Sequence, residues 1–155
     1  MKLMPIDQIY IKDEDGWGGF RTIEGFGGYN GLFKSAGLVI FFDEAVGSYQ
    51  GSSYLILNDP DGDKWGFRTY GWGSCSGCDS LQAANSLEDF ESLRDSLLTG
   101  IIWQDGKAGL VAWLKAHDWL GDWTGRDVLE NGILEQMVKA LGGSTEGLPT
   151  LPSED

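Results

Sequence analysis

Both cysteines of the chain lie in one short turn, Gly73-Ser74-Cys75-Ser76-Gly77-Cys78-Asp79, and this turn has the most reactive chemistry in the sequence. Two residues separate Cys75 from Cys78, a spacing that lets two thiolates bind one zinc ion, and Gly77 permits the tight backbone of such a site. A tetrahedral site needs further ligands, which would be His117, the only histidine, together with Asp79, Asp118 or Asp122. The sequence therefore leaves open zinc as a cofactor, bound by Cys75, Cys78 and His117.

The same turn is compatible with other chemistry. The stretch Gly73-Ser74-Cys75-Ser76-Gly77 matches the Gly-x-nucleophile-x-Gly elbow of hydrolases, in which Cys75 would be the nucleophile and His117 its general base. A redox pair is less well supported, because no βαβ pattern surrounds the two cysteines. The remaining interpretation is structural, with two small side chains packed in a glycine-rich loop. A pair of cysteines alone does not decide between these alternatives.

The elements that must position this turn change in type near Asn85. Before it, short runs rich in β-branched or aromatic residues predict strands at Gln8–Lys12, Trp17–Ile23, Leu38–Phe42, Ser53–Asn58 and Trp65–Tyr70. Between the last two runs, Asp59-Pro60-Asp61-Gly62-Asp63 has the composition of a tight turn. We therefore expect Ser53–Tyr70 to form an antiparallel hairpin.

After Asn85 the apolar residues follow a helical period. Ser86 is a candidate cap for a first helix, a second is predicted from Asp105 to His117, and a third follows a Thr124 cap. The predicted fold is α+β, a glycine-rich and mainly antiparallel sheet from the N-terminal half covered on one face by about three helices from the C-terminal half. Residues 1–142 are expected to form a single domain, and residues 143–155 a disordered tail.

The charge of the chain is its second strong signal. Eleven Lys and Arg residues stand against 24 Asp and Glu residues, for a formal net charge of −13. Such a field repels nucleic acid and anionic membranes, and it speeds encounters with a basic protein surface. The chain also has no long apolar run and no signal-peptide pattern at its start, so we expect a soluble cytoplasmic protein whose partner is a basic protein surface.

Part of this charge is arranged along the helix that follows Ser86. Glu88, Glu91 and Asp95 fall on one flank, away from the apolar stripe, and a rise of about 1.5 Å per residue spaces them roughly 4.5 and 6 Å apart along the axis. Comparable spacing separates the phosphates of a nucleic-acid strand. The flank therefore predicts a nucleic-acid mimic, with an ordinary solvated helix face as the alternative.

Four further residues are candidates for the same binding surface. Asp127 and Glu130 add charge from the third helix, and Trp119 and Trp123 precede that helix in a loop. Large aromatic side chains in such a loop either anchor a partner or pack as a lid. We predict that all four contribute to binding together with the carboxylates of the first helix.

The segment around the cysteine turn also carries a resemblance. It contains Ser48-Tyr49-Gln50-Gly51, Trp65-Gly66 and the stretch from Tyr70 to Ala83, of which Gly-Ser-Cys-Ser-Gly-Cys-Asp is the specific part. Over about a third of its length the chain resembles small acidic proteins of bacteriophages and their hosts. The resemblance implies an inhibitor of host or defence machinery, located in the host-cell cytoplasm, and it implies no catalytic residue.

Together these features predict a non-enzymatic acidic binding protein that inhibits a basic, nucleic-acid-handling protein. Two alternatives belong to other classes. One is a cysteine-dependent hydrolase that uses Cys75 and His117. The other is a protein that sequesters a small ligand in a pocket lined by aromatic side chains of the sheet.

Overall fold

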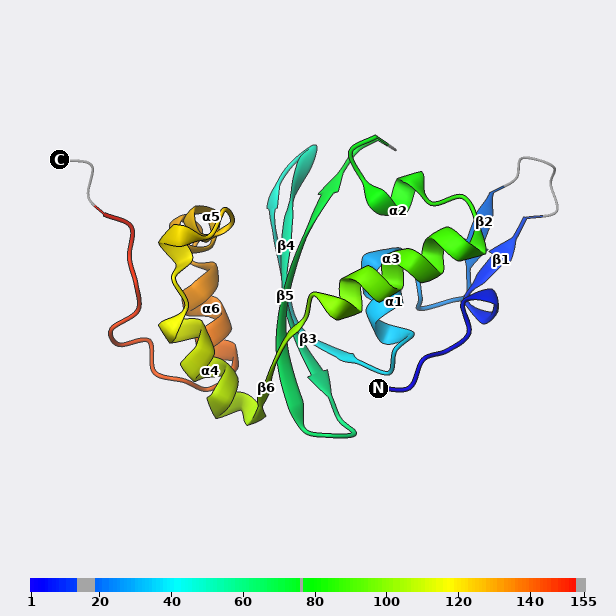
Figure 1. The fold of residues 1–155 in the computed structure, drawn as a ribbon. Coiled ribbons are helices and arrows are strands. Elements are labelled where there is room, and N and C mark those ends of the chain that lie inside the picture. Colours follow the sequence, from blue (N-terminus) through cyan, green and yellow to red (C-terminus); the bar gives the residue numbers. More distant parts are fainter. Residues whose placement is uncertain (14–18, 76, 153–155) are drawn as a thin grey trace.

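A four-stranded antiparallel sheet stands between two helical layers in the computed structural model, which describes residues 1–13, 19–75 and 77–152 (Figure 1). Its strands, in spatial order, are β3 (Val39–Gly47), β4 (Gln50–Asp59), β5 (Lys64–Gly73) and β6 (Ile102–Asp105). The predicted hairpin is confirmed, because β4 and β5 pair with Tyr54 opposite Thr69 and Asn58 opposite Trp65. The α+β class and the antiparallel sheet are thereby confirmed as well.

The helices cover both faces of this sheet. The first layer, on the right in Figure 1, contains η1 (Ile6–Gln8), β1 (Tyr10–Lys12), β2 (Phe20–Thr22), α1 (Gly28–Lys34), α2 (Ser80–Ala83) and α3 (Leu87–Thr99). The second layer, on the left, contains α4 (Gly106–Ala116), η2 (Trp119–Gly121), α5 (Gly125–Glu130) and α6 (Ile133–Ala140).

The prediction of helices on one face was wrong, and β4 shows the physical reason. Side chains alternate between the two faces of a strand. On β4, Tyr54 and Ile56 pack into the core of the second layer, whereas Leu55 and Leu57 pack into the core of the first. All four are fully buried, so each face of the sheet needs its own helical cover.

The predicted first helix is confirmed as α3. The Ser86 side chain caps it by accepting a hydrogen bond from the Asp89 backbone N–H at 3.1 Å. The second predicted helix, α4, follows a short strand, β6, that the sequence pattern did not indicate. The third is divided into α5 and α6 at Gly132, which adopts a left-handed backbone with φ of 67°. Glycine reaches that conformation without a steric penalty, and it ends the helical ladder there.

The remaining segments differ from the sequence pattern in smaller ways. Helix α1 was not predicted, because its Gly28 and Gly31 have low helix propensity. Residues 143–152 were predicted to belong to a disordered tail; they run along the second layer, where Leu148 packs against its core. Residues 153–155 lie outside the described residues. None of the described helices has the length and apolar content that crossing a bilayer requires.

Candidate functional site

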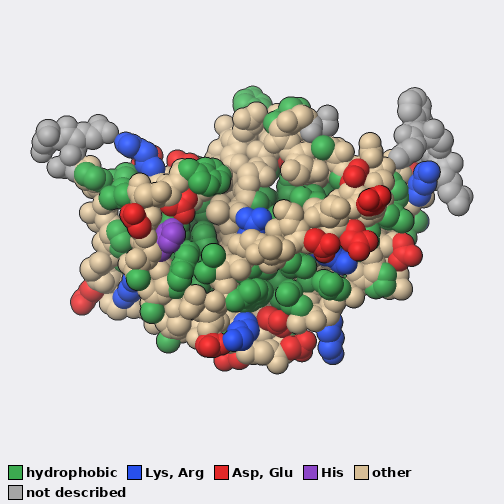
Figure 2. Space-filling view, viewed as in Figure 1, with side chains coloured by type: hydrophobic (Ala, Val, Ile, Leu, Met, Phe, Trp, Pro, Cys, Tyr) green, Lys and Arg blue, Asp and Glu red, His purple; other side chains and the backbone are tan. Residues whose placement is uncertain are grey.

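The three carboxylates predicted on the first helix lie together on the exposed flank of α3. Glu88, Glu91 and Asp95 are exposed, and Figure 2 shows Asp and Glu side chains gathered on the part of the surface where α3 lies. No Lys or Arg of the described residues forms an ion pair with any of the three, although every Lys and Arg of the chain is described. Their charge is therefore available to a partner.

The opposite side of α3 holds that flank in place. Phe90, Arg94 and Leu97 are buried beneath the helix. The Arg94 guanidinium donates to the Met4 carbonyl at 2.5 Å and to the Ser35 hydroxyl at 3.1 Å, so it links α3 to the chain start and to the end of α1. A buried arginine with these partners fixes the rotation of the helix about its axis, because its charge needs hydrogen-bond acceptors inside the core.

The C-terminal end of α3 is fixed to the sheet. Arg68 on β5 donates from Nε to the Leu97 carbonyl at 2.8 Å, which is one of the carbonyls that a helix end leaves without an intrahelical partner. Burial lowers the pKa of the Arg68 guanidinium. With a serine cap at one end and an arginine at the other, α3 presents its acidic flank as a rigid row of charges.

The other predicted contact residues lie on the far side of the sheet from α3. Asp127 and Glu130 are exposed on α5, and Trp123 precedes that helix with 79% of its surface exposed. Trp119, by contrast, is 1% exposed, and its indole N–H donates to the Leu114 carbonyl at 2.8 Å. Trp119 is therefore a core residue and cannot anchor a partner. The seven predicted residues thus do not form one surface.

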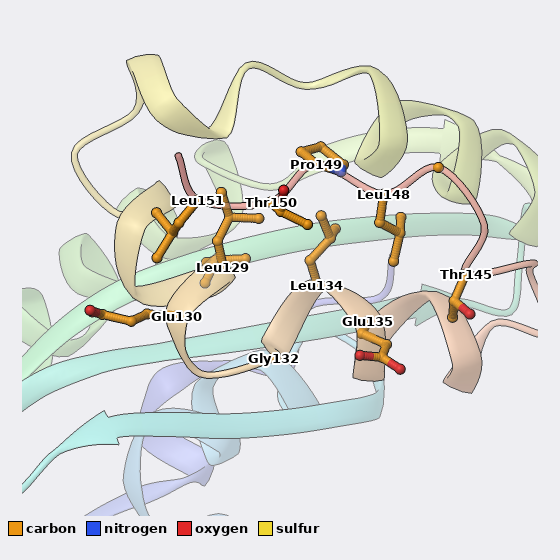
Figure 3. Close-up of a pocket in the computed structure, with 12 residues that line it drawn as sticks. Leu129, Glu130, Gly132, Leu134, Glu135, Thr145, Leu148, Pro149, Thr150 and Leu151 are labelled. Atoms are coloured by element: carbon orange, nitrogen blue, oxygen red, sulfur yellow. The ribbon is translucent and has the colours of Figure 1, made fainter. Parts of the chain in front are cut away.

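A groove of about 490 Å³ runs beside Glu130 in the second layer (Figure 3). Leu129 and Leu134 line it from α5 and α6, and Leu148 and Leu151 line it from the segment that follows α6. This groove was not predicted from the sequence, because residues 143–155 were expected to form a disordered tail. The repeated leucines of that tail were the available signal.

The predicted cysteine turn is organised around a buried carboxylate. Asp79 is 7% exposed, and it accepts hydrogen bonds from the Tyr29 hydroxyl at 2.6 Å and from the Gly73 N–H at 2.9 Å. It also caps α2 through the Leu81 and Gln82 N–H groups. Burial raises the pKa of Asp79, but these hydrogen bonds outweigh burial, so that the pKa lies below its ordinary value.

Cys75 and Cys78 are joined to each other in a disulfide within this turn. His117 lies elsewhere: its Nε2 is 3.0 Å from Asp122 Oδ2, and its ring stacks on Trp113 with centroids 4.6 Å apart. Within the described ranges, no group of three or more His, Cys, Asp or Glu side chains could hold a metal ion. The structure therefore assembles neither the predicted zinc site nor a Cys75–His117 catalytic pair.

His117 and Asp122, which the sequence offered together only as possible zinc ligands, form a local pair. Burial raises the pKa of Asp122, yet hydrogen bonds from Thr124 and His117 outweigh burial and hold that pKa below its ordinary value. The Asp122 carboxylate therefore remains ionised and orients the imidazole. Its other contacts, to the backbone and hydroxyl of Thr124, are those of a turn that leads into α5.

A second cavity, of about 310 Å³, bears on the small-ligand alternative. Aromatic side chains of Tyr10, Phe20 and Phe90 line it, and the Tyr10 and Phe90 rings stack with centroids 3.8 Å apart. Tyr10 and Phe20 come from β1 and β2, which lie within two of the predicted strands, whereas Phe90 comes from α3. The stacking of Tyr10 on Phe90 also ties the small hairpin to the helix.

No protein-family model, curated protein or solved structure matches the chain. The candidate function therefore follows from the geometry of the chain's own residues. Among the predicted contact residues, Glu88, Glu91 and Asp95 share one rigid helix and have no ion-pair partner in the described part of the chain. Carboxylates so arranged bind ammonium and guanidinium groups through charge-assisted hydrogen bonds.

Proposed function

We propose that the protein is a non-enzymatic binding protein whose acidic α3 flank, defined as Glu88, Glu91 and Asp95, contacts a basic surface of another protein. The observation that carries this proposal is the row of three exposed carboxylates that form no ion pair with any Lys or Arg in the part of the chain that the structure describes. An unpaired row of like charge opposes folding slightly through self-repulsion. A partner with complementary charge relieves this repulsion, and the attraction makes its association faster and more specific.

The chemistry of the partner follows from the spacing. Along α3 the carboxylates succeed one another at roughly 4.5 and 6 Å, given a rise of about 1.5 Å per residue. The phosphates of a nucleic-acid strand, which Lys and Arg side chains bind, are spaced at intervals comparable to those of the three carboxylates. A nucleic-acid-handling protein is therefore the proposed target, and occupation of its basic surface would inhibit it. That this target belongs to a host or its defence machinery is what the resemblance to small phage proteins implies.

The net charge of the chain supports the same partner class. With 24 acidic and eleven basic residues, the protein attracts basic surfaces from a distance and repels nucleic acid itself. A protein that competes with nucleic acid for one site needs both properties. The hydrolase alternative has no comparable support, because Cys75 is joined to Cys78 and His117 pairs with Asp122.

The test compares two triple variants of equal charge. E88K/E91K/D95K reverses the α3 flank, and D127K/E130K/E135K reverses three exposed carboxylates of the second layer. Proteins captured from a host extract by the wild type are identified by mass spectrometry, and binding of the purified partner is then measured at several salt concentrations. We expect the α3 variant to bind at least about tenfold more weakly, chiefly through a slower on-rate, and the second-layer variant to bind like the wild type.

Other results would contradict the proposal. Equal losses in both variants would mean that total charge matters and the α3 flank does not. A loss confined to D127K/E130K/E135K would move the site to the second layer. Affinity that does not change between 50 and 500 mM salt, roughly a change from a 14 to a 4 Å screening length, would exclude an electrostatic site.

A further inference from the structure

The disulfide of the cysteine turn is placed where an external thiol can reach it. Cys75 and Cys78 lie between the end of β5 and the start of α2, and their Cα atoms are 5.3 Å apart. Cys75 is exposed, whereas Cys78 is half-buried. Exposed disulfides exchange with thiols more readily than buried ones, because the incoming thiolate must reach a sulfur atom.

The surroundings distinguish the two sulfur atoms. The Cys75 backbone N–H donates to Cys78 Sγ at 2.9 Å. Cys78 Sγ also packs against the backbone of Gly73, where an added Cβ would lie only 2.6 Å from the sulfur. Cys78 is therefore the covered sulfur, and a thiolate formed there would keep a backbone N–H donor that stabilises negative charge. Cys75 has neither the cover of Gly73 nor that donor.

Hydrogen bonds hold the turn in addition to the disulfide. Asp79 joins its two ends by accepting from the Gly73 N–H and by capping α2, and the Gln82 side chain donates to the Gly73 carbonyl at 2.6 Å. None of these bonds involves a cysteine side chain, so opening the disulfide removes none of their donors or acceptors. Both thiols then stay close together, so the disulfide can close again without a search through disordered conformations.

We propose that Cys75 and Cys78 form a reversible thiol–disulfide exchange site for an external dithiol, with Cys75 Sγ as the sulfur that is attacked and Cys78 as the leaving thiolate. A thiolate of the dithiol attacks Cys75 Sγ, a mixed disulfide forms and the Cys75–Cys78 bond breaks. The second thiolate of the dithiol then attacks the dithiol sulfur that is bonded to Cys75 Sγ; the two sulfur atoms of the dithiol form a disulfide, and Cys75 leaves as a thiolate. The protein gains two electrons, the dithiol is oxidised, and the two thiol protons pass to solvent or to the cysteines.

The first measurement uses the full chain, purified without reductant. Native protein is incubated with dithiothreitol, or with mixtures of reduced and oxidised glutathione, then alkylated with N-ethylmaleimide and weighed as the intact chain. We expect the disulfide to open in native buffer and to close again when the reductant is removed, with the thermal transition shifted by only a few degrees, about the effect of closing a very short loop. A disulfide that opens only in denaturant would overturn the proposal.

The second measurement tests the asymmetry between the sulfur atoms. In C78S the thiol of Cys75 remains, and in C75S that of Cys78 remains. We expect C78S to form a mixed disulfide with oxidised glutathione, with release of reduced glutathione, at least about tenfold faster than C75S, because only Cys75 is exposed. S74A, which changes an exposed neighbour, serves as the control with both cysteines present and should exchange like the wild type.

Circular dichroism establishes that each variant is folded before its rate is compared. If one cysteine variant does not fold, the wild type is used to determine which sulfur is attacked. Its mixed disulfide is formed with excess glutathione, and peptide mapping shows which cysteine carries the adduct. An adduct mainly on Cys78, or equal rates in C75S and C78S, would refute the assigned roles. If dithiothreitol opens the Cys75–Cys78 disulfide and glutathione does not, the reductant is a dithiol and not a monothiol, as proposed.

Discussion

The Tyr29 hydroxyl donates a 2.6 Å hydrogen bond to the buried carboxylate of Asp79 and thereby joins α1 to the cysteine turn. Burial, together with this bond to Asp79, raises the pKa of Tyr29, so the hydroxyl stays protonated and remains a donor. The same hydroxyl accepts a hydrogen bond from the Leu81 N–H at 3.1 Å. One tyrosine thus connects two elements that lie 50 residues apart in the chain.

The first prediction concerns this pair. Asp79→Ala leaves several donors without an acceptor, so we expect it to lower the free energy of unfolding by about 2–4 kcal/mol. Tyr29→Phe removes one charge-assisted hydrogen bond and should cost about 1.5–3 kcal/mol. Urea denaturation measures both, with Tyr49→Phe, at a position 80% exposed, as the neutral control. Equal stability of Asp79→Ala and the wild type would show that the turn does not need the carboxylate.

The second prediction concerns the pH dependence of stability. The pKa of Asp79 lies below its ordinary value of 3.8 in the folded protein. The carboxylate therefore contributes stability that is fully present above that ordinary value and is lost as the pH falls through the lowered pKa. We expect the difference in unfolding free energy between the wild type and Asp79→Asn to be constant near neutral pH and to shrink below about pH 4. A difference that grows on acidification would contradict the assigned direction.

These two predictions show where sequence patterns succeed and where they fail. The hairpin of β4 and β5 and the capped helix α3 depend on local signals, a Pro-Asp-Gly turn and a serine before an apolar stripe, and both were predicted. The role of Asp79 depends on Tyr29, which comes from a glycine-rich segment with low helix propensity. No local pattern indicates a contact between residues so far apart, and so Asp79 was considered from the sequence only as a possible zinc ligand beside the cysteines.

The predicted binding residues also divide into those placed correctly by a local pattern and those whose position depends on distant parts of the chain. Helical periodicity placed Glu88, Glu91 and Asp95 on one flank, and that flank is exposed as expected. Helical periodicity could not show that Asp127 and Glu130 lie in the second layer. A second layer is needed because both faces of β4 are apolar and each must be covered by helices. The run of buried residues along β4 was the available signal, since a strand with one solvated face alternates between apolar and polar residues.

The third prediction concerns metal. Because Cys75 and Cys78 are joined and His117 pairs with Asp122, we expect purified protein to contain less than about a tenth of an equivalent of zinc and to keep its melting temperature in chelator. Elemental analysis of protein prepared without chelator decides this. One full equivalent of zinc, lost together with stability in chelator, would restore the cysteine–histidine site that the spacing of the sequence leaves open.

The fourth prediction compares two helical glycines. A Cβ at Gly125 would lie 1.4 Å from the Trp119 carbonyl oxygen, so Gly125→Ala must displace the backbone of η2. We expect a loss of about 3 kcal/mol or more, in the range of strong overpacking. Gly109 on α4 has only an ordinary contact at 3.5 Å, so Gly109→Ala should gain about 0.5–1 kcal/mol from helix propensity. Thermal denaturation of both variants tests the close approach of α5 to η2.

The last prediction separates the two tryptophans that the sequence analysis grouped together. Trp119 is 1% exposed, contacts the rings of Phe67 and His117 and donates to the Leu114 carbonyl, whereas Trp123 is 79% exposed. We expect Trp119→Ala to cost about 3–5 kcal/mol, since it leaves a large cavity and an unpaired carbonyl. Trp123→Ala should change stability by less than about 0.5 kcal/mol.

Binding measurements on the Trp123→Ala variant also test which layer contacts the partner. Trp123 lies across the sheet from α3, so a partner that contacts Glu88, Glu91 and Asp95 should bind Trp123→Ala with unchanged affinity. If Trp119→Ala is too unstable to purify, Trp119→Phe keeps part of the packing and should still lower the melting temperature clearly more than Trp123→Ala. A partner whose affinity falls in Trp123→Ala but not in E88K/E91K/D95K would bind the second layer, and the α3 flank would then be an ordinary solvated helix face.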